Sequence, residues 1–205
     1  MPNLPLKAVL TAALTALSTA SEGATQFALY SNLSRDTLVR PNGVNPDFMS
    51  VDMAWLHVDT LYAAMPVFEA ACSAPGQARC WRASAGAAPF IGVSSGGKVI
   101  VQPGSNKAAI VRWQNVLGGK VRMLAYFSDV DSACGNGVDW YVDNGPFNVA
   151  SGHLQNTGPG AGTAFSKTFN NLIPTEPIYL IITPGGNQDS ACDATEVDVM
   201  FTEQF

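Results

Sequence analysis

The chain has 205 residues, of which 13% are charged, with 11 basic and 16 acidic side chains and a net charge of -5. This balance argues against a nucleic-acid partner, because binding to phosphate polymers rests on neutralising them with Lys and Arg. The 19 glycines and 13 prolines favour many strands and turns over long amphipathic helices.

Residues 1–20 have the layout of a secretory signal peptide. The segment MPNLPLK carries one basic residue, and AVLTAALTALSTA follows as an apolar stretch that ends in small residues. This stretch is shorter than the roughly 20 residues that span a bilayer. We therefore expect bacterial-type export with cleavage after Ala20, a secreted or cell-surface location, and no membrane span. Residues 21–205 are expected to form a single domain.

Residues 21–96 are the part of the mature chain with the weakest pattern. The segments FALYSNLS and VDMAWLHV have β-like composition. The segment DTLYAAMPVFEAACSAPG is compatible with one short helix that ends at Pro75 and Gly76. We expect this region to complete a sandwich with edge strands and a cover.

Short β-like runs recur from residue 97 onward, with turn residues between them. They start roughly 10 to 20 residues apart and show no helical period, which indicates an antiparallel sandwich or barrel. PIYLIIT is apolar at nearly every position and is expected to be a central strand covered on both faces. The fold class is therefore all-β, with about eight or more strands and at most one short helix. The eight predicted strands are residues 97–102, 108–114, 120–128, 137–143, 147–155, 163–170, 177–183 and 196–203.

Four cysteines, Cys72, Cys80, Cys134 and Cys192, are expected to form two disulfides in an exported chain, and three pairings are possible. A zinc site is disfavoured, since no C-x-x-C occurs and only two histidines are present. The motif Asp-Ser-Ala-Cys ends at both Cys134 and Cys192, and each copy precedes an alternating strand. If these strands run the same way, the two cysteines enter at one end. We therefore favour Cys134–Cys192, with Cys72–Cys80 as a local bridge.

The segment DVDSACGN, residues 129–136, raises the question of a metal loop. It begins like an EF-hand loop, but the twelfth position is Trp140, where a bidentate carboxylate is needed. A calcium site of another kind remains open, because calcium takes several hard oxygen ligands. The alternative is a turn in which the acids cap and solvate the backbone. The candidate ligands are Asp129, Asp131, Asn136 and Asp139, joined by Asp189 or Asp193.

Catalytic motifs are weak. GVSSG matches G-x-S-x-G around Ser94, but that motif functions between a strand and a helix, whereas the following GKVIVQPG predicts a strand and a turn. Neither His57 nor His153 has a recognisable partner in the sequence. The spacing of the glutamates selects no pair for glycoside hydrolysis. We therefore expect no catalytic residue and a non-enzymatic protein.

Aromatic side chains suggest sugar binding, because a flat apolar ring with a polar edge suits the apolar face of a sugar. Trp140 falls at an inward position of its strand and is expected in the core. Tyr141 lies on the opposite face, flanked by Asp139 and Asp143, and Tyr126 is a second exposed candidate. These four polar residues are the predicted ligand-binding set.

Residues 81–201 resemble the exported bacterial β-sandwich domains found in PEP-CTERM-type surface proteins and beside polysaccharide-active domains. The shared features are a tryptophan, a P-x-x-G turn, a QPG turn, a VRW strand, a G-x-V strand and a D-x-D-x-x-x-G-x-GV segment, and PGGNQDSACDATEVDV is similar to the closing strand. The matching positions are Trp81, residues 89–92, 103–104 and 111–113, Gly119, Val121, Asp129, Asp131, Gly135, Gly137 and Val138.

This resemblance implies a jelly-roll-like, non-catalytic, exported module similar to carbohydrate-binding modules. Its expected partner is an extracellular polysaccharide or a surface protein. The chain departs from the pattern in showing no C-terminal sorting motif and no appended catalytic domain, which favours free secretion or non-covalent attachment. Two alternatives stay open. One is a structural or self-assembling envelope or matrix protein, which suits the low charge; the other is an enzyme acting on an extracellular polymer.

Overall fold

The computed structural model describes residues 27–32, 49–55, 62–114, 118–131, 133–155 and 161–204. The predicted signal peptide and His57 lie outside these residues. The described residues form strands, turns and loops, with no helix among them. Consequently no described segment is a helix long and apolar enough to cross a membrane.

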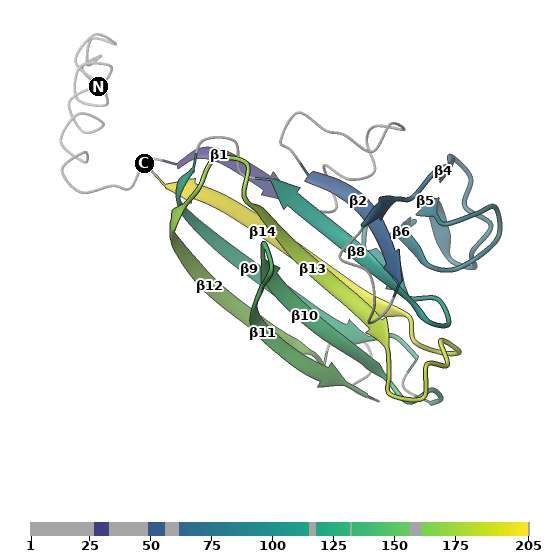
Figure 1. Cartoon of the computed structure of the whole chain (residues 1–205). Helices are drawn as coiled ribbons and strands as arrows, with labels where there is room; N and C mark the ends of the chain where they lie inside the picture. Colours follow the sequence, from purple (N-terminus) through teal and green to yellow (C-terminus); the bar gives the residue numbers. More distant parts are fainter. Residues whose placement is uncertain are drawn as a thin grey trace, which may run out of the picture.

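Two antiparallel sheets lie face to face as a β-sandwich (Figure 1). The first has eight strands in the order β12-β9-β14-β7-β6-β5-β4, and β1 also pairs with β14. The second has six strands in the order β11-β10-β13-β8-β2-β3. The eight-stranded sheet comprises β1 (Phe27–Asn32), β4 (Val67–Glu69), β5 (Gln77–Arg82), β6 (Phe90–Ser94), β7 (Val99–Gln102), β9 (Gly119–Asp129), β12 (Thr163–Leu172) and β14 (Thr195–Gln204). The six-stranded sheet comprises β2 (Met49–Trp55), β3 (Ala63–Ala64), β8 (Lys107–Gln114), β10 (Val138–Asn144), β11 (Phe147–Leu154) and β13 (Pro177–Pro184).

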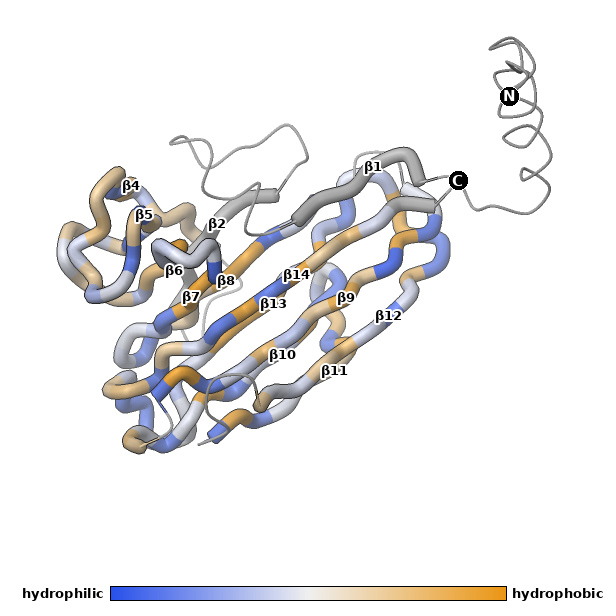
Figure 2. Tube along the Cα trace, turned by 180° about the vertical axis from the view of Figure 1, so that it is seen from behind, coloured by the Kyte–Doolittle hydropathy of each residue, from blue (hydrophilic) through white to orange (hydrophobic). Residues whose placement is uncertain are grey.

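The eight strands predicted from residue 97 onward are present as β7 to β14, and no end is displaced by more than two residues. Hydrophobic and hydrophilic positions alternate along the strands (Figure 2) because one face of each sheet packs on the other. β13 lies between β10 and β8, as expected for a central strand. It is covered on both faces, since Leu180 is 1% exposed and the neighbouring Ile181 is 9% exposed.

The short helix expected before Pro75 is wrong. Residues 63–64 pair with β2 and residues 67–69 pair with β5. The physical reason is Pro66, which lacks a backbone donor and disfavours helical geometry at the residue before it. The segment therefore contributes short edge strands to both sheets, which agrees with the expected role of this region.

The core between the sheets is built on aromatic pairs that each join one sheet to the other. Trp113 of β8 stacks on Phe201 of β14, with ring centroids 4.7 Å apart. Trp140 of β10 stacks on Phe127 of β9 at 4.8 Å. Both tryptophans are at most 6% exposed, so the inward position predicted for Trp140 is confirmed.

Both disulfides have the pairing favoured by the sequence. Cys134 bonds to Cys192, and Cys72 bonds to Cys80. Cys134 precedes β10 of one sheet and Cys192 precedes β14 of the other, so these two strands begin at the same end of the sandwich. The bond therefore ties the two sheets together at that end.

Candidate functional site

β10 presents acidic and aromatic side chains alternately with core residues. Trp140 and Val142 are buried between the sheets, whereas Asp139, Tyr141 and Asp143 point to the outer face of the six-stranded sheet and are half-buried. The strand has this property because side chains at alternating positions face opposite sides of a sheet. Three of the predicted ligand-binding residues therefore share one surface.

Further tyrosines lie on the same surface. Tyr179 of β13 is the cross-strand neighbour of Asp143, and its ring lies 4.5 Å from that of Tyr62. Tyr62, Tyr141 and Tyr179 all pack on a small apolar cluster on this outer side of the sheet. The members of that cluster are Ala108, Ile110 and Ile181.

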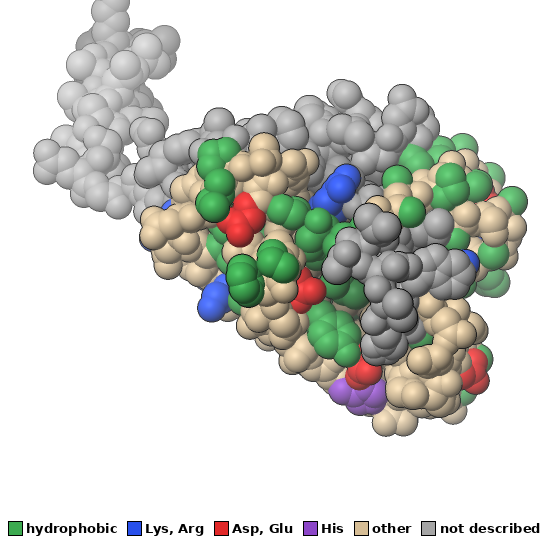
Figure 3. Space-filling view, viewed as in Figure 1, with side chains coloured by type: hydrophobic (Ala, Val, Ile, Leu, Met, Phe, Trp, Pro, Cys, Tyr) green, Lys and Arg blue, Asp and Glu red, His purple; other side chains and the backbone are tan. Residues whose placement is uncertain are grey.

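We call this surface the tyrosine face and define it by Tyr62, Tyr141 and Tyr179 with Asp139 and Asp143. In Figure 3, hydrophobic side chains lie among acidic ones over the strands of the six-stranded sheet that face the viewer, with a histidine near the lower edge. The surface combines ring faces with carboxylates, which is a mixture of apolar contact and hydrogen-bond acceptors.

Neighbouring side chains hold the two carboxylates of the tyrosine face in place. His153 of β11 lies 2.7 Å from Asp139, measured from Nδ1 to Oδ1. Asn148 donates a hydrogen bond of 2.8 Å from Nδ2 to Oδ1 of Asp143. No partner for His153 could be recognised in the sequence, and in the structure Asp139 of the adjacent strand is its partner. Each acid is thus oriented while part of its carboxylate remains available to a ligand.

The surroundings of Tyr62 and Tyr141 favour the protonated form of their hydroxyls. Burial raises the pKa of Tyr141, and the charges of Asp139 and Asp143 raise it further. The pKa of Tyr62 is also raised, first by burial and then by Asp143 and Tyr179. A protonated phenol both donates and accepts hydrogen bonds, so these groups complement the acceptor-only carboxylates.

Tyr126 lies on the other side of the molecule. It belongs to β9, and its side chain borders a shallow hollow of about 400 Å³ on the outer face of the eight-stranded sheet. Tyr126 and Tyr141 therefore do not form a single site, although both were predicted as ligand contacts. The hollow is lined by Leu124, Ala125, Tyr126, Ala164, Phe165, Ser166, Asp198 and Met200.

The predicted metal ligands lie in three different places. Asp129 and Asp131 lie near Asp193, since their charges act on its pKa. Asn136 instead places its amide nitrogen against the Gly185 backbone, where a Cβ would collide with it. Asp139 pairs with His153 on the tyrosine face.

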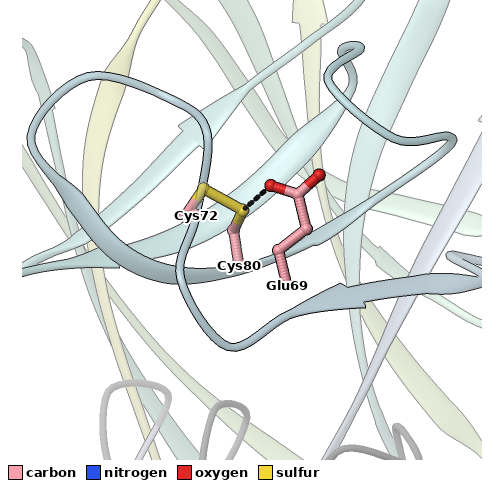
Figure 4. Close-up of side chains that lie close together, drawn as sticks. All are labelled: Glu69, Cys72 and Cys80. Carbon is pink, nitrogen blue, oxygen red and sulfur yellow. Dashed lines mark hydrogen bonds between the residues drawn. A yellow bond between two sulfur atoms is a disulfide. The ribbon is translucent and has the colours of Figure 1, made fainter.

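Glu69, Cys72 and Cys80 are the one group of three potential metal-binding side chains that lie within 4.8 Å of one another in the described part of the chain (Figure 4). The two sulfurs are joined in a disulfide, so they do not offer the thiolates that a metal would bind. Glu69 instead accepts hydrogen bonds from Ser73, at 2.8 Å from N to Oε2, and from the buried Arg82, at 3.1 Å from Nε to Oε2. The cluster is structural and anchors the Cys72–Cys80 loop.

Acid is expected to weaken this anchor. The backbone hydrogen bond from Ser73 is the largest of the interactions that lower the pKa of Glu69 from 4.5 to about 2. The ionised carboxylate thus stabilises the fold above about pH 4.5, and this contribution is lost as the pH falls towards about 2. Thermal unfolding of the wild type and Glu69→Gln across this range measures the effect. At neutral pH the variant is expected to melt earlier, because Arg82 is buried and loses its counter-charge.

The control is Glu196→Gln. Glu196 pairs with the exposed Lys98 at 2.8 Å, and such surface pairs contribute little to stability. A Glu69→Gln protein whose midpoint follows the wild type at every pH would contradict the anchoring role of this carboxylate.

Ser94 is the last residue of β6 and borders the hairpin turn that leads to β7. Its Oγ accepts a hydrogen bond of 3.1 Å from the backbone nitrogen of Lys98. The backbone of the same two residues is paired, with Ser94 N donating to Lys98 O at 2.9 Å. The serine therefore has the turn role that its sequence context predicts.

Comparisons with known proteins give no family assignment. No protein-family model and no curated protein matches the chain. It is similar to the C-terminal CBM6 of LamC, a marine laminarinase from Zobellia galactanivorans, with 18% identity over 55% of this chain and 86% of that chain and a TM-score of 0.36. It is also similar to CBM51 of a Clostridium perfringens GH95 protein in complex with methyl-galactose, with 9% identity over 85% and 100% of the two chains and a TM-score of 0.44. A third similar structure is the K3 cleaved adhesin domain of Lys-gingipain from Porphyromonas gingivalis, at 12% identity over 87% and 100% and a TM-score of 0.42. The resemblance to PEP-CTERM-type domains stays a prediction.

Two features of the structure were not predicted from the sequence. Tyr62 and Tyr179 join Tyr141 on the tyrosine face, and Asp193 is buried beside the acidic loop. The outward position of Tyr179 could have been predicted from the segment PIYLIIT, because Tyr179 alternates with the inward Ile178 and Leu180. The position of Tyr62 depends on strand pairing across the sheet, which local pattern does not specify.

Proposed function

We propose that the protein is a secreted, non-catalytic module that binds an extracellular glycan on the tyrosine face. The observation that supports this most is the grouping of three tyrosines with two carboxylates on one outer sheet face, each carboxylate oriented by a neighbouring side chain. The two disulfides suit an oxidising, extracellular location.

The chemistry of this face matches that of a sugar. A pyranose ring has an apolar face that packs on an aromatic ring, and its hydroxyls need hydrogen-bond acceptors. Tyr141 offers a ring between Asp139 and Asp143, so a sugar lying on it has a carboxylate at either side. The face is an outer sheet surface that runs across β10 and β13, which suits an extended polymer.

Truncation of Tyr141 is expected to weaken glycan binding about tenfold or more, because aromatic side chains at the centre of a contact contribute most of the affinity. The measurement is isothermal titration with the glycan selected from a panel of soluble and insoluble polysaccharides. Tyr179→Ala is expected to have a comparable effect, since its ring lies on the same face.

The matched control is Tyr126→Ala on the opposite sheet, which is expected to bind as the wild type does. Failure of the wild type to bind any member of the panel would contradict the proposed function. Loss of binding in Tyr126→Ala with retention in Tyr141→Ala would place the site in the hollow of the eight-stranded sheet and overturn the assignment to the tyrosine face.

A further inference from the structure

Asp193 is a buried carboxylate without a partner. The residue is 1% exposed, and no hydrogen-bond donor among the described residues reaches Oδ1 or Oδ2. Burying an ionised carboxylate is costly unless it is paired, hydrogen-bonded or bound to a metal. A position like this in a native fold therefore requires either a bound proton or a bound cation.

The surroundings of Asp193 are acidic. Asp129 ends β9 opposite Thr195 of β14, and Val130 N donates to Ala194 O at 2.9 Å, so the end of β9 lies against the segment that contains Asp193. Burial raises the pKa of Asp193 to about 7, and the charges of Asp189, Asp129 and Asp131 add to the rise. His153 acts in the opposite direction and has the smallest effect of the interacting charges.

Oxygen atoms from the backbone converge on the same place. A Cβ placed on Gly135 would lie 2.9 Å from Cys192 O, 3.1 Å from Ala191 O and 3.1 Å from Asp193 Oδ1. Gly135 has φ 86°, in the left-handed region that favours glycine, and so no side chain fills this space. The Cys134–Cys192 disulfide holds the two loops against each other here.

We propose that Asp193 is the central ligand of a calcium site that joins the two Asp-Ser-Ala-Cys loops. The carbonyl oxygens of Ala191 and Cys192 supply neutral ligands, and Asp129, Asp131 and Asp189 are the acidic neighbours whose charges act on the same carboxylate. The site is distinct from the tyrosine face and independent of the proposed glycan binding. Its role is to fix the end of the sandwich at which β10 and β14 begin.

Calcium is the cation that this donor set fits. The ligands are all oxygen, they come from irregular loops, and they combine a carboxylate with backbone carbonyls in an acidic surrounding, as calcium prefers. Magnesium requires near-octahedral geometry and keeps several of its waters, and zinc favours nitrogen and sulfur ligands. The two sulfurs in these loops are used in the disulfide.

The test is a thermal-unfolding and calorimetric titration of the whole mature protein with calcium chloride at neutral pH after treatment with chelator. A ligand that binds only the folded state raises the unfolding midpoint. At a hundredfold excess over the dissociation constant the expected rise is roughly 5 to 10 °C, and excess chelator should reverse it. Calorimetry is expected to give one calcium ion per chain.

Asp193→Asn is the decisive variant, because it keeps the shape of the side chain and removes the charge. It is expected to lose the calcium-induced rise while unfolding, without calcium, at a midpoint no lower than that of the wild type. Asp131→Asn is expected to weaken calcium binding with its fold intact, which guards against a loss caused by misfolding. Asp198→Asn, on the outer face of the eight-stranded sheet, is the control and should respond as the wild type does.

Two results would overturn the proposal. A wild-type midpoint that is the same with calcium and with chelator would mean that Asp193 is simply a buried protonated acid. An undiminished calcium response in Asp193→Asn would mean that the ion binds elsewhere on the protein.

Discussion

Removal of the Cys134–Cys192 bond is expected to lower the free energy of unfolding by roughly 4 kcal/mol, which is among the largest effects expected for this protein. The bond closes a loop of 58 residues, and the chain-entropy model assigns a greater stabilisation to longer loops. Because the bond also links a strand of each sheet, its loss releases the two sheets at the end where β10 and β14 begin. The Cys134→Ala/Cys192→Ala protein is expected to unfold at a markedly lower urea concentration.

The other disulfide has to be separated from this effect. Cys72 and Cys80 are only eight residues apart, so the same model gives roughly 2.5 kcal/mol for their bond. In a Cys72→Ala/Cys80→Ala background, Cys134–Cys192 is the remaining bond, and comparison of the oxidised and reduced forms isolates its contribution. Equal urea midpoints for those two forms would show that the bond does not stabilise the sandwich.

Trp140→Ala is expected to destabilise the fold by roughly 3 to 5 kcal/mol, the usual cost of removing a large aromatic side chain from a core. Its ring stacks on Phe127 of the opposite sheet and lies 6.1 Å from that of Phe165. Gly152 of β11 leaves room for the ring, since a Cβ there would lie 2.6 Å from it. The truncation therefore leaves a cavity that three strands border. Urea unfolding measures the loss.

The neighbouring residue provides a matched comparison. Tyr141→Ala changes the next position of the same strand but the opposite face, so it is expected to cost far less stability while it weakens glycan binding. Trp140→Ala, where it remains folded, is expected to keep the binding surface. Equal destabilisation by the two substitutions would contradict the assignment of Tyr141 to a functional surface.

Local sequence pattern predicted the strands after residue 97 well, and the reason is visible in β10. Its alternation of Val138, Trp140 and Val142 with polar residues is the direct signature of a strand with one buried face. Glycine-rich and proline-rich turns set the ends of such strands. The cysteine pairing could also be predicted, because the repeated Asp-Ser-Ala-Cys motif places Cys134 and Cys192 just before the starts of strands.

The residues of the candidate site could be predicted from the sequence only in part. Asp139, Tyr141 and Asp143 share a face within one strand, so alternation was sufficient to group them. Tyr62 and Tyr179 reach the same face through pairing between strands distant in sequence, which depends on sheet order. Tyr126 was wrongly grouped with Tyr141 for the same reason. Alternation predicts that a side chain points outward, but it does not predict which of the two sheets the strand joins.

The burial of Asp193 could not be predicted for a related reason. The sequence placed it in a polar loop, where exposure is the ordinary expectation. The Cys134–Cys192 disulfide and the pairing of β14 with β9 hold this loop against the end of β9. The carboxylate of Asp193 is buried between the loop and β9. The same contact brings Asp129 and Asp131 towards it and leaves Asn136 and Asp139 directed elsewhere.

The decisive measurement for the glycan-binding role of the tyrosine face is NMR mapping of amide chemical shifts. An oligosaccharide that the protein binds is titrated into the isotope-labelled protein. We expect chemical-shift perturbations concentrated on residues 139–143 of β10, on Tyr179 and on Tyr62. Perturbations concentrated around Tyr126 on the opposite sheet, with the tyrosine face unchanged, would contradict it.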